Sequence, residues 1–179
     1  AGCRAIVDDV VDLDRLVEIY LGGGSRYTIV RDDDYIAAPR RGTGYRSRHL
    51  VVKFSDPDGL QGFDRHFVEL QFRTLKQHAW STAAEPVGLI GNEALKGVFG
   101  DANWLRLFQT MASEFAEDEG KPLVEGVSDI ADERRKELGE IDRELGALQV
   151  LQSCNRAIKI TEDYSRTSAP YYLIQYNIA

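Results

Sequence analysis

Hydrophobic and polar positions follow two different spacings along the chain. Apolar residues three and four positions apart predict amphipathic helices, whereas apolar residues that alternate with polar ones predict strands with one buried face. Helices are expected at residues 13–21, 75–82, 104–111 and 129–152. Strands are expected at residues 1–7, 27–30, 46–54, 66–72 and 171–176. Because a turn sequence, Asp-Pro-Asp-Gly, separates the strands at 46–54 and 66–72, these two should form an antiparallel hairpin.

The first and last of these helices carry further signals. Asp9 or Asp12 can cap the start of the helix at 13–21, and three consecutive glycines follow its end. The stretch 129–152 is expected to be one continuous helix, because its apolar residues fall on a single face. These residues are Leu138, Ile141, Leu145, Leu148 and Leu151.

The stretch 31–49 interrupts the pattern. Pro39, Gly42 and Gly44 punctuate it, so a loop is expected here rather than part of a helix or strand. Its arginines are Arg31, Arg40, Arg41, Arg46 and Arg48. Because guanidinium donors match phosphate oxygens and Tyr45 offers a face for a base, this loop is a candidate nucleotide-binding segment. The alternative is a solvated loop whose charges bind nothing.

A second group of polar residues lies in the strand before residue 75. Alternation places Glu69, Gln71 and Arg73 on one face, while their apolar neighbours face the core. A carboxylate beside a guanidinium suits a metal–phosphate site, because the carboxylate can hold Mg²⁺ or accept a hydroxyl proton and the arginine offsets phosphate charge. The alternative is an ion pair across the strand face.

Composition and missing motifs exclude several classes of protein. The 179 residues carry a formal net charge of −7, which disfavours DNA binding that ignores sequence. This acidity is concentrated at residues 117–144, so it does not exclude a phosphate-rich ligand at the arginine-rich loop. The sequence contains no run of about 18 apolar residues, so it predicts no membrane helix. Its two cysteines, Cys3 and Cys154, lack metal-type spacing and are typical of a reduced, cytoplasmic protein. Zinc-protease, P-loop and nucleophile-elbow motifs are absent from the sequence.

Five segments, taken in order over residues 1–85, resemble the synthetase domain of the RelA/SpoT alarmone-synthetase family. They are Ala1–Ile6, Asp34–Ile36 with Pro39, Gly44–His49, Glu69–Thr74 and His78–Trp80. The resemblance implies an α+β fold, with a mixed sheet of about five strands flanked by helices, similar to nucleotidyltransferases. It implies a synthetase domain at residues 1–100 and a C-terminal helical extension with a terminal strand at residues 101–179.

The resemblance also implies an activity. Such enzymes are pyrophosphokinases that move the β,γ-diphosphate of ATP onto the 3′-hydroxyl of GDP or GTP to make (p)ppGpp, with Mg²⁺ bridging the phosphates. By position, Glu69 is the catalytic carboxylate and a Mg²⁺ ligand, Tyr45 stacks on the acceptor base, and Arg4 packs on the donor adenine. The acceptor and phosphate pocket is expected to include His49, Gln71, Arg73 and His78, with Arg46 and Arg48 as phosphate contacts. The family's other Mg²⁺ ligand, an Asp, would precede residue 1, so we expect the chain to lack its natural N-terminus.

Two alternatives remain open at this point. One is a toxin-like relative that pyrophosphorylates the 3′ end of tRNA or an adenosine nucleotide. The other is a nucleotide-binding regulator that keeps the fold without catalysis. The C-terminal part could also bind a protein partner, such as an antitoxin or a protein that the chain senses. The sequence contains no hydrolase metal motif of the HD type.

Overall fold

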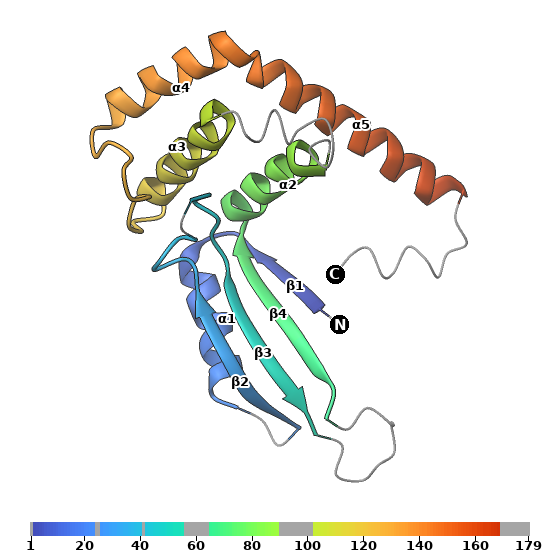
Figure 1. The fold of residues 1–179 in the computed structure, drawn as a ribbon. Helices are drawn as coiled ribbons and strands as arrows, with labels where there is room; N and C mark the ends of the chain where they lie inside the picture. Colours follow the sequence, from blue (N-terminus) through green and yellow to red (C-terminus); the bar gives the residue numbers. More distant parts are fainter. Residues whose placement is uncertain (1, 24–25, 41, 56–64, 90–101, 169–179) are drawn as a thin grey trace.

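The computed structural model describes residues 2–23, 26–40, 42–55, 65–89 and 102–168. The elements follow one another along the chain as β1 (Gly2–Val7), α1 (Val10–Leu21), β2 (Tyr27–Asp34), β3 (Arg48–Phe54), β4 (Phe67–Thr74), α2 (Leu75–Leu89), α3 (Ala102–Asp118), α4 (Ala131–Leu145) and α5 (Ala147–Ser168). Figure 1 shows the strands as one sheet with α1 against it. The later helices lie beyond the end of the sheet at which β4 leads into α2 (Figure 1). No helix in these ranges is both long and apolar enough to cross a membrane.

The sheet is mixed, as expected. Its strands lie in the order β1-β4-β3-β2, with β1 parallel to β4 and the other pairs antiparallel. The hairpin predicted between the strands that became β3 and β4 is therefore confirmed. The expected count of about five strands was too high for the described residues, which form four. The strand expected at 171–176 lies outside the described residues.

One face of the sheet is covered by α1. Of the two candidate caps, Asp9 and Asp12, the structure selects Asp9, whose side chain accepts a hydrogen bond from the backbone N–H of Asp12. Its apolar side packs into a core with the inner face of the sheet, and the fully buried members of that core include Leu13, Leu50 and Phe72. Burial of this face against α1 leaves the opposite face of the sheet for the polar side chains of the same strands.

A second core joins α2 to the helices that follow. Its buried members are Trp80, Trp104, Leu107, Phe108, Ala112, Val124, Val127, Ile141 and Ala147. The amphipathic helix predicted around Trp104 is confirmed as α3, and Phe108 accepts a hydrogen bond at its backbone oxygen from the Trp80 indole. The proposed domain boundary near residue 100 falls outside the described residues and stays a prediction.

Two predicted elements need correction. The loop expected at 31–49 is shorter, because β2 runs to Asp34 and β3 begins at Arg48. The strand ends at Asp34 since its carboxylate accepts hydrogen bonds from the next two free backbone N–H groups and so starts a turn. The continuous helix expected at 129–152 is two helices, because Gly146 adopts a left-handed conformation with φ 59° and ends α4. Leu148, expected on the apolar face, is consequently 57% exposed.

Candidate functional site

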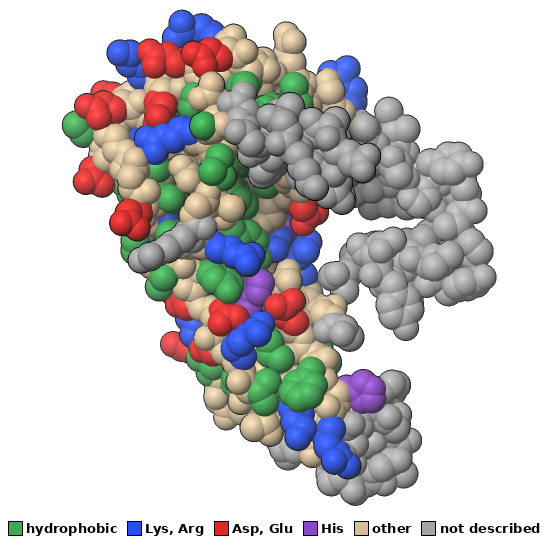
Figure 2. Space-filling view, viewed as in Figure 1, with side chains coloured by type: hydrophobic (Ala, Val, Ile, Leu, Met, Phe, Trp, Pro, Cys, Tyr) green, Lys and Arg blue, Asp and Glu red, His purple; other side chains and the backbone are tan. Residues whose placement is uncertain are grey.

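A row of polar side chains crosses the open face of the sheet. In the strand register Asp33 pairs with His49, His49 with Gln71, and Gln71 with Arg4, so each of the four strands contributes one residue. Figure 2 shows acidic and basic side chains gathered around a histidine in the middle of this face. The strand register aligns this row across the sheet. The hydrogen bonds of Gln71 to Glu69 and Arg73 confirm the common face that alternation predicted for these three residues.

Glu69 lies on this face with both carboxylate oxygens engaged. Its Oε1 is 3.2 Å from His49 Nδ1, and its Oε2 accepts a hydrogen bond of 3.0 Å from Gln71 Nε2. The guanidinium of Arg31 lies 4.0 Å from Oε1. The hydrogen bond from Gln71 is the largest effect that lowers the pKa of Glu69, and it is followed by the hydrogen bond of His49, the charge of His49 when that ring is protonated, and the charge of Arg31, against some burial. The carboxylate is therefore ionised at neutral pH while its side chain stays 35% exposed.

Arg73 lies deeper, at 4% exposure. Its Nη2 donates to Gln71 Oε1 at 3.2 Å and to the Tyr45 hydroxyl at 2.7 Å. Its Nε and Nη1 are buried and have no hydrogen-bond partner within the described residues. Gln71 therefore lies between Glu69 and Arg73 and bonds to both, in place of the direct ion pair that was the alternative reading of this strand.

Tyr45 connects this network to the aromatic core. Its hydroxyl is 2.8 Å from His49 Nε2, and its ring packs edge-on against Tyr35, His49 and Trp80. The same ring lines a cavity of about 240 Å³ whose other lining residues are Arg40, Thr43, Trp80, Ala84, Leu105 and Phe108. Burial, the largest effect, lowers the pKa of His49 against the opposing charge of Glu69. His49 is thus a neutral imidazole at neutral pH.

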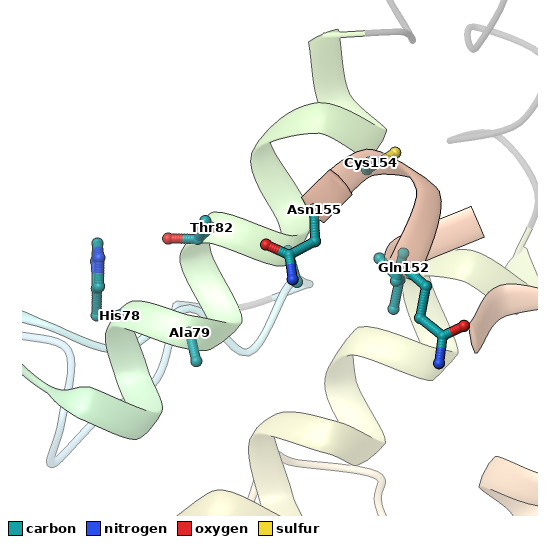
Figure 3. A pocket seen from close by; sticks show the side chains of 8 residues that line it. His78, Ala79, Thr82, Gln152, Cys154 and Asn155 are labelled. Carbon is teal, nitrogen blue, oxygen red and sulfur yellow. The ribbon is translucent and has the colours of Figure 1, made fainter. Parts of the chain in front are cut away.

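His78 lies at a second cavity, of about 420 Å³, between α2 and α5. Figure 3 shows His78, Ala79 and Thr82 on α2, with Gln152, Cys154 and Asn155 on α5. Burial and then the charges of Arg4 and Arg73 lower the pKa of His78. The residues from α5 were missed in the sequence, where nothing in their spacing links them to a position more than 70 residues earlier. Cys154 and Cys3 are both free thiols.

Arg46 and Arg48 have partners that differ from those expected. Arg46 is 3% exposed, and its guanidinium donates to the backbone oxygens of Ile36, at 2.7 Å, and of Pro122. Arg48 forms a bidentate ion pair with Asp32 at 2.6 Å and also donates a hydrogen bond to Asp34. Both side chains hold the connection between β2 and β3 in place, so the structure does not offer them as free phosphate ligands. Arg41 lies outside the described residues.

The donor groups on the open face of the sheet determine whether a metal ion fits there. Within the described ranges, no group of three or more His, Cys, Asp or Glu side chains is arranged to hold one. Asp33, which supplies the carboxylate of the row, forms an ion pair of 2.9 Å with Arg31. Glu69 fits a site in which it supplies one oxygen and substrate phosphates supply others, which is how proteins commonly bind Mg²⁺.

The mixed sheet, with one face covered by α1 and the other open, defines an α+β fold, and comparison with known families adds a family to it. Residues 1–87 match the family described as the region found in RelA / SpoT proteins. The matched part of the chain builds the sheet and most of α2. This confirms the resemblance drawn from the five sequence segments. Comparison with curated proteins gives no match.

Solved structures show the same fold. Small alarmone synthetase 1 from Bacillus subtilis, bound to its product pppGpp, is 30% identical over 66% of this chain and 58% of its own, with a TM-score of 0.50. Small alarmone synthetase 2 from the same organism is 24% identical over 65% and 61%, with a TM-score of 0.51. The protein smu.1046c from Streptococcus mutans UA159 is 26% identical over 66% and 57%, with a TM-score of 0.50. This chain thus spans less than two thirds of the length of each.

Proposed function

We propose that this chain is a pyrophosphokinase that transfers the β,γ-diphosphate of ATP to the 3′-hydroxyl of GDP or GTP. The observation that carries the proposal is the Glu69 carboxylate, ionised and in hydrogen-bond contact with Gln71 and His49 on the open face of a RelA/SpoT-type sheet. The guanidinium of Arg73 is separated from Glu69 by the side chain of Gln71, and it has no carboxylate partner among the described residues. A base and a buried positive charge are what transfer of a phosphorylated group requires.

The chemistry assigns a role to each group. A bond forms between the acceptor 3′-oxygen and the β-phosphorus of ATP, the bond from that phosphorus to the α-phosphate oxygen breaks, and AMP leaves. Glu69 accepts the proton of the hydroxyl. Arg73 offsets the negative charge of the phosphates. Bound Mg²⁺ would neutralise further phosphate charge, and Glu69 is the residue that would hold it.

The two substrates are assigned to opposite sides of Glu69. Tyr45 and the cavity of about 240 Å³ that it lines are proposed to take the acceptor base. Arg4, whose Nε is 3.5 Å from Gln71 Oε1, is proposed to take the donor nucleotide on the β1 side. His78, which the resemblance had placed in the acceptor and phosphate pocket, is proposed to lie on the donor side instead, because the charge of Arg4 acts on it. The product pppGpp in the small alarmone synthetase 1 structure supports a guanosine nucleotide as acceptor.

The structure favours a nucleotide over a tRNA 3′ end as acceptor. The tRNA alternative depended on free arginines beside the pocket, and two of these, Arg46 and Arg48, are occupied by carbonyls and carboxylates. Neutralisation of each further tRNA phosphate needs another basic side chain. Arg40 is the member of that group still placed at the Tyr45 cavity.

Purified protein supplied with ATP labelled in the β- or γ-phosphate tests the proposal directly. GDP, GTP and deacylated tRNA are offered in parallel, and we expect label on the guanosine nucleotides. Glu69→Gln should abolish transfer while nucleotide binding persists. Glu18→Gln, the same change on the exposed side of α1, should have no effect.

Other outcomes decide against the proposal. Label on tRNA alone would replace the guanosine acceptor with the toxin-like activity. Nucleotide binding without labelled product on any acceptor would favour the non-catalytic regulator. An unchanged transfer rate in Glu69→Gln would remove Glu69 from its assigned role.

A further inference from the structure

Five side chains of the site form a closed circuit of hydrogen bonds. Starting from Arg73 Nη2, one arm runs to the Tyr45 hydroxyl at 2.7 Å, from there to His49 Nε2 at 2.8 Å, and from His49 Nδ1 to Glu69 Oε1 at 3.2 Å. The other arm runs from Arg73 Nη2 to Gln71 Oε1 at 3.2 Å and from Gln71 Nε2 to Glu69 Oε2 at 3.0 Å. Both arms begin at the same guanidinium and end at the same carboxylate.

The two end groups fix the direction of every hydrogen bond in the circuit. A guanidinium can only donate and an ionised carboxylate can only accept. Because Arg73 donates to the Tyr45 oxygen, the single hydroxyl proton of Tyr45 is free to be donated to His49 Nε2. Nε2 is then an acceptor, so the ring proton of neutral His49 must be on Nδ1, where it is donated to Glu69 Oε1. The Tyr45 hydroxyl at Nε2 and the Glu69 carboxylate at Nδ1 thus select the same tautomer of His49.

The opposite tautomer would break the circuit at two points. A proton on Nε2 would leave the Tyr45 hydroxyl proton without an acceptor in the circuit. The lone pair of Nδ1 would then face the carboxylate oxygen of Glu69 at 3.2 Å, where the two acceptors repel one another. Hydrogen bonds that share one direction along a chain also polarise and strengthen one another.

We propose that the hydroxyl of Tyr45 is a positioning group that fixes His49 as the Nδ1–H tautomer and thereby orients the Glu69 carboxylate. This role is separate from base stacking, which uses the face of the Tyr45 ring. The part that concerns catalysis depends on the proposed function, because it takes Glu69 as the group that accepts the hydroxyl proton. The part that concerns the tautomer depends on the geometry alone.

Tyr45→Phe separates the two roles of this side chain. The variant keeps the aromatic ring and its edge contacts with His49 and Trp80, but it removes the donor to Nε2. We expect the KM for the acceptor to change by less than about twofold and kcat to fall by about tenfold to a hundredfold, the range in which a misplaced catalytic group lowers rates. Tyr35→Phe is the matched control, because Tyr35 contacts Tyr45 and His49 through its ring and lies outside the circuit.

The tautomer can be measured without any activity. In protein labelled with ¹⁵N-histidine, two-bond ¹⁵N–¹H correlations at pH 7.5 distinguish a protonated from an unprotonated ring nitrogen, and His49→Gln assigns the signals. We expect His49 to carry its proton on Nδ1 in the native protein and in Tyr35→Phe. In Tyr45→Phe we expect the Nε2–H form to become populated.

The outcomes separate this inference from the proposed function. A native His49 protonated on Nε2, or a tautomer that Tyr45→Phe leaves unchanged, would overturn the inference whether or not the protein transfers diphosphate. A protein without transferase activity but with the expected tautomers would overturn the catalytic part alone. If Tyr45→Phe shifts the tautomer and keeps the native kcat, the hydroxyl does not position Glu69 for catalysis.

Discussion

Gln77 and Glu119, which are 42 residues apart in the sequence, are joined by a hydrogen bond of 3.0 Å from Gln77 Nε2 to Glu119 Oε2. The other carboxylate oxygen of Glu119 accepts a hydrogen bond from the Thr74 hydroxyl. Thr74 and Gln77 also bond each other's backbone N–H groups at the start of α2. Glu119, which follows α3, therefore stabilises the junction between β4 and α2. Thr74, at this junction, is the residue next to Arg73.

Glu119→Ala should destabilise the protein by about 1–3 kcal/mol. The substitution leaves the hydroxyl of Thr74 and the amide of Gln77, which are 0% and 3% exposed, without their acceptor, and a buried donor without a partner costs free energy of this order. Urea unfolding followed by circular dichroism measures the loss.

Asp118→Ala is the matched control for this prediction. Asp118 also reaches α2, through an ion pair of 2.8 Å with Lys76, but both side chains are largely solvated. Asp118→Ala should reduce the unfolding free energy much less than Glu119→Ala does, because exposed ion pairs contribute little to stability. Equal losses of unfolding free energy in the two variants would contradict the role of Glu119 at the junction between β4 and α2.

Stability should fall as the pH drops from 8 towards 5.5. Burial lowers the pKa values of His49 and His78 in the folded protein, so below about pH 6.5, where histidines in the unfolded chain become protonated, the unfolded state binds more protons. The stabilising contribution is thus complete above that pH and is lost as the pH falls below it. The urea midpoint measured across this range gives the slope.

His49→Gln and His78→Gln should each flatten that slope, because glutamine does not titrate. The double variant should flatten it further, since both shifts have the same direction. A slope that stays native in the double variant would assign the pH dependence to other groups.

Cys154 should report on the cavity between α2 and α5. Its thiol is partly buried there beside Gln152 and Asn155, whereas Cys3 is exposed on β1. In a Cys3→Ser background, a thiol reagent should label Cys154 several-fold more slowly when a non-hydrolysable ATP analogue is present, because the donor nucleotide is proposed to bind on the His78 side.

GDP serves as the comparison in this labelling experiment. It is assigned to the Tyr45 side and should leave the labelling rate of Cys154 unchanged. Protection by GDP, or none by the ATP analogue, would contradict the assignment of the donor to this side of the site.

Local pattern sufficed for some features of this molecule and failed for others. The common face of Glu69, Gln71 and Arg73 follows from alternation within one strand, so it was predictable. The partners of Arg46 were not predictable, because one of them, the Pro122 carbonyl, is 76 residues away in the segment between α3 and α4. The closed circuit through Tyr45 likewise needs the strand register, which sequence spacing does not specify.

Gly44 and Gly42 offer a matched pair for the segment that carries Tyr45. Both have left-handed backbones, with φ of 80° and 83°, so alanine at either position is strained by about 1–3 kcal/mol. At Gly42 an added Cβ meets nothing within 4 Å, but at Gly44 it would lie 2.9 Å from Ala112 Cβ and 3.1 Å from Val124 Cγ2. Gly44→Ala should therefore cost about 1–3 kcal/mol more than Gly42→Ala, the range for overpacking a core. It should also weaken binding of the acceptor nucleotide, because relief of that clash moves the adjacent Tyr45. Equal unfolding free energies for the two variants would show that α3 gives way at Ala112 and that the segment is not held against it.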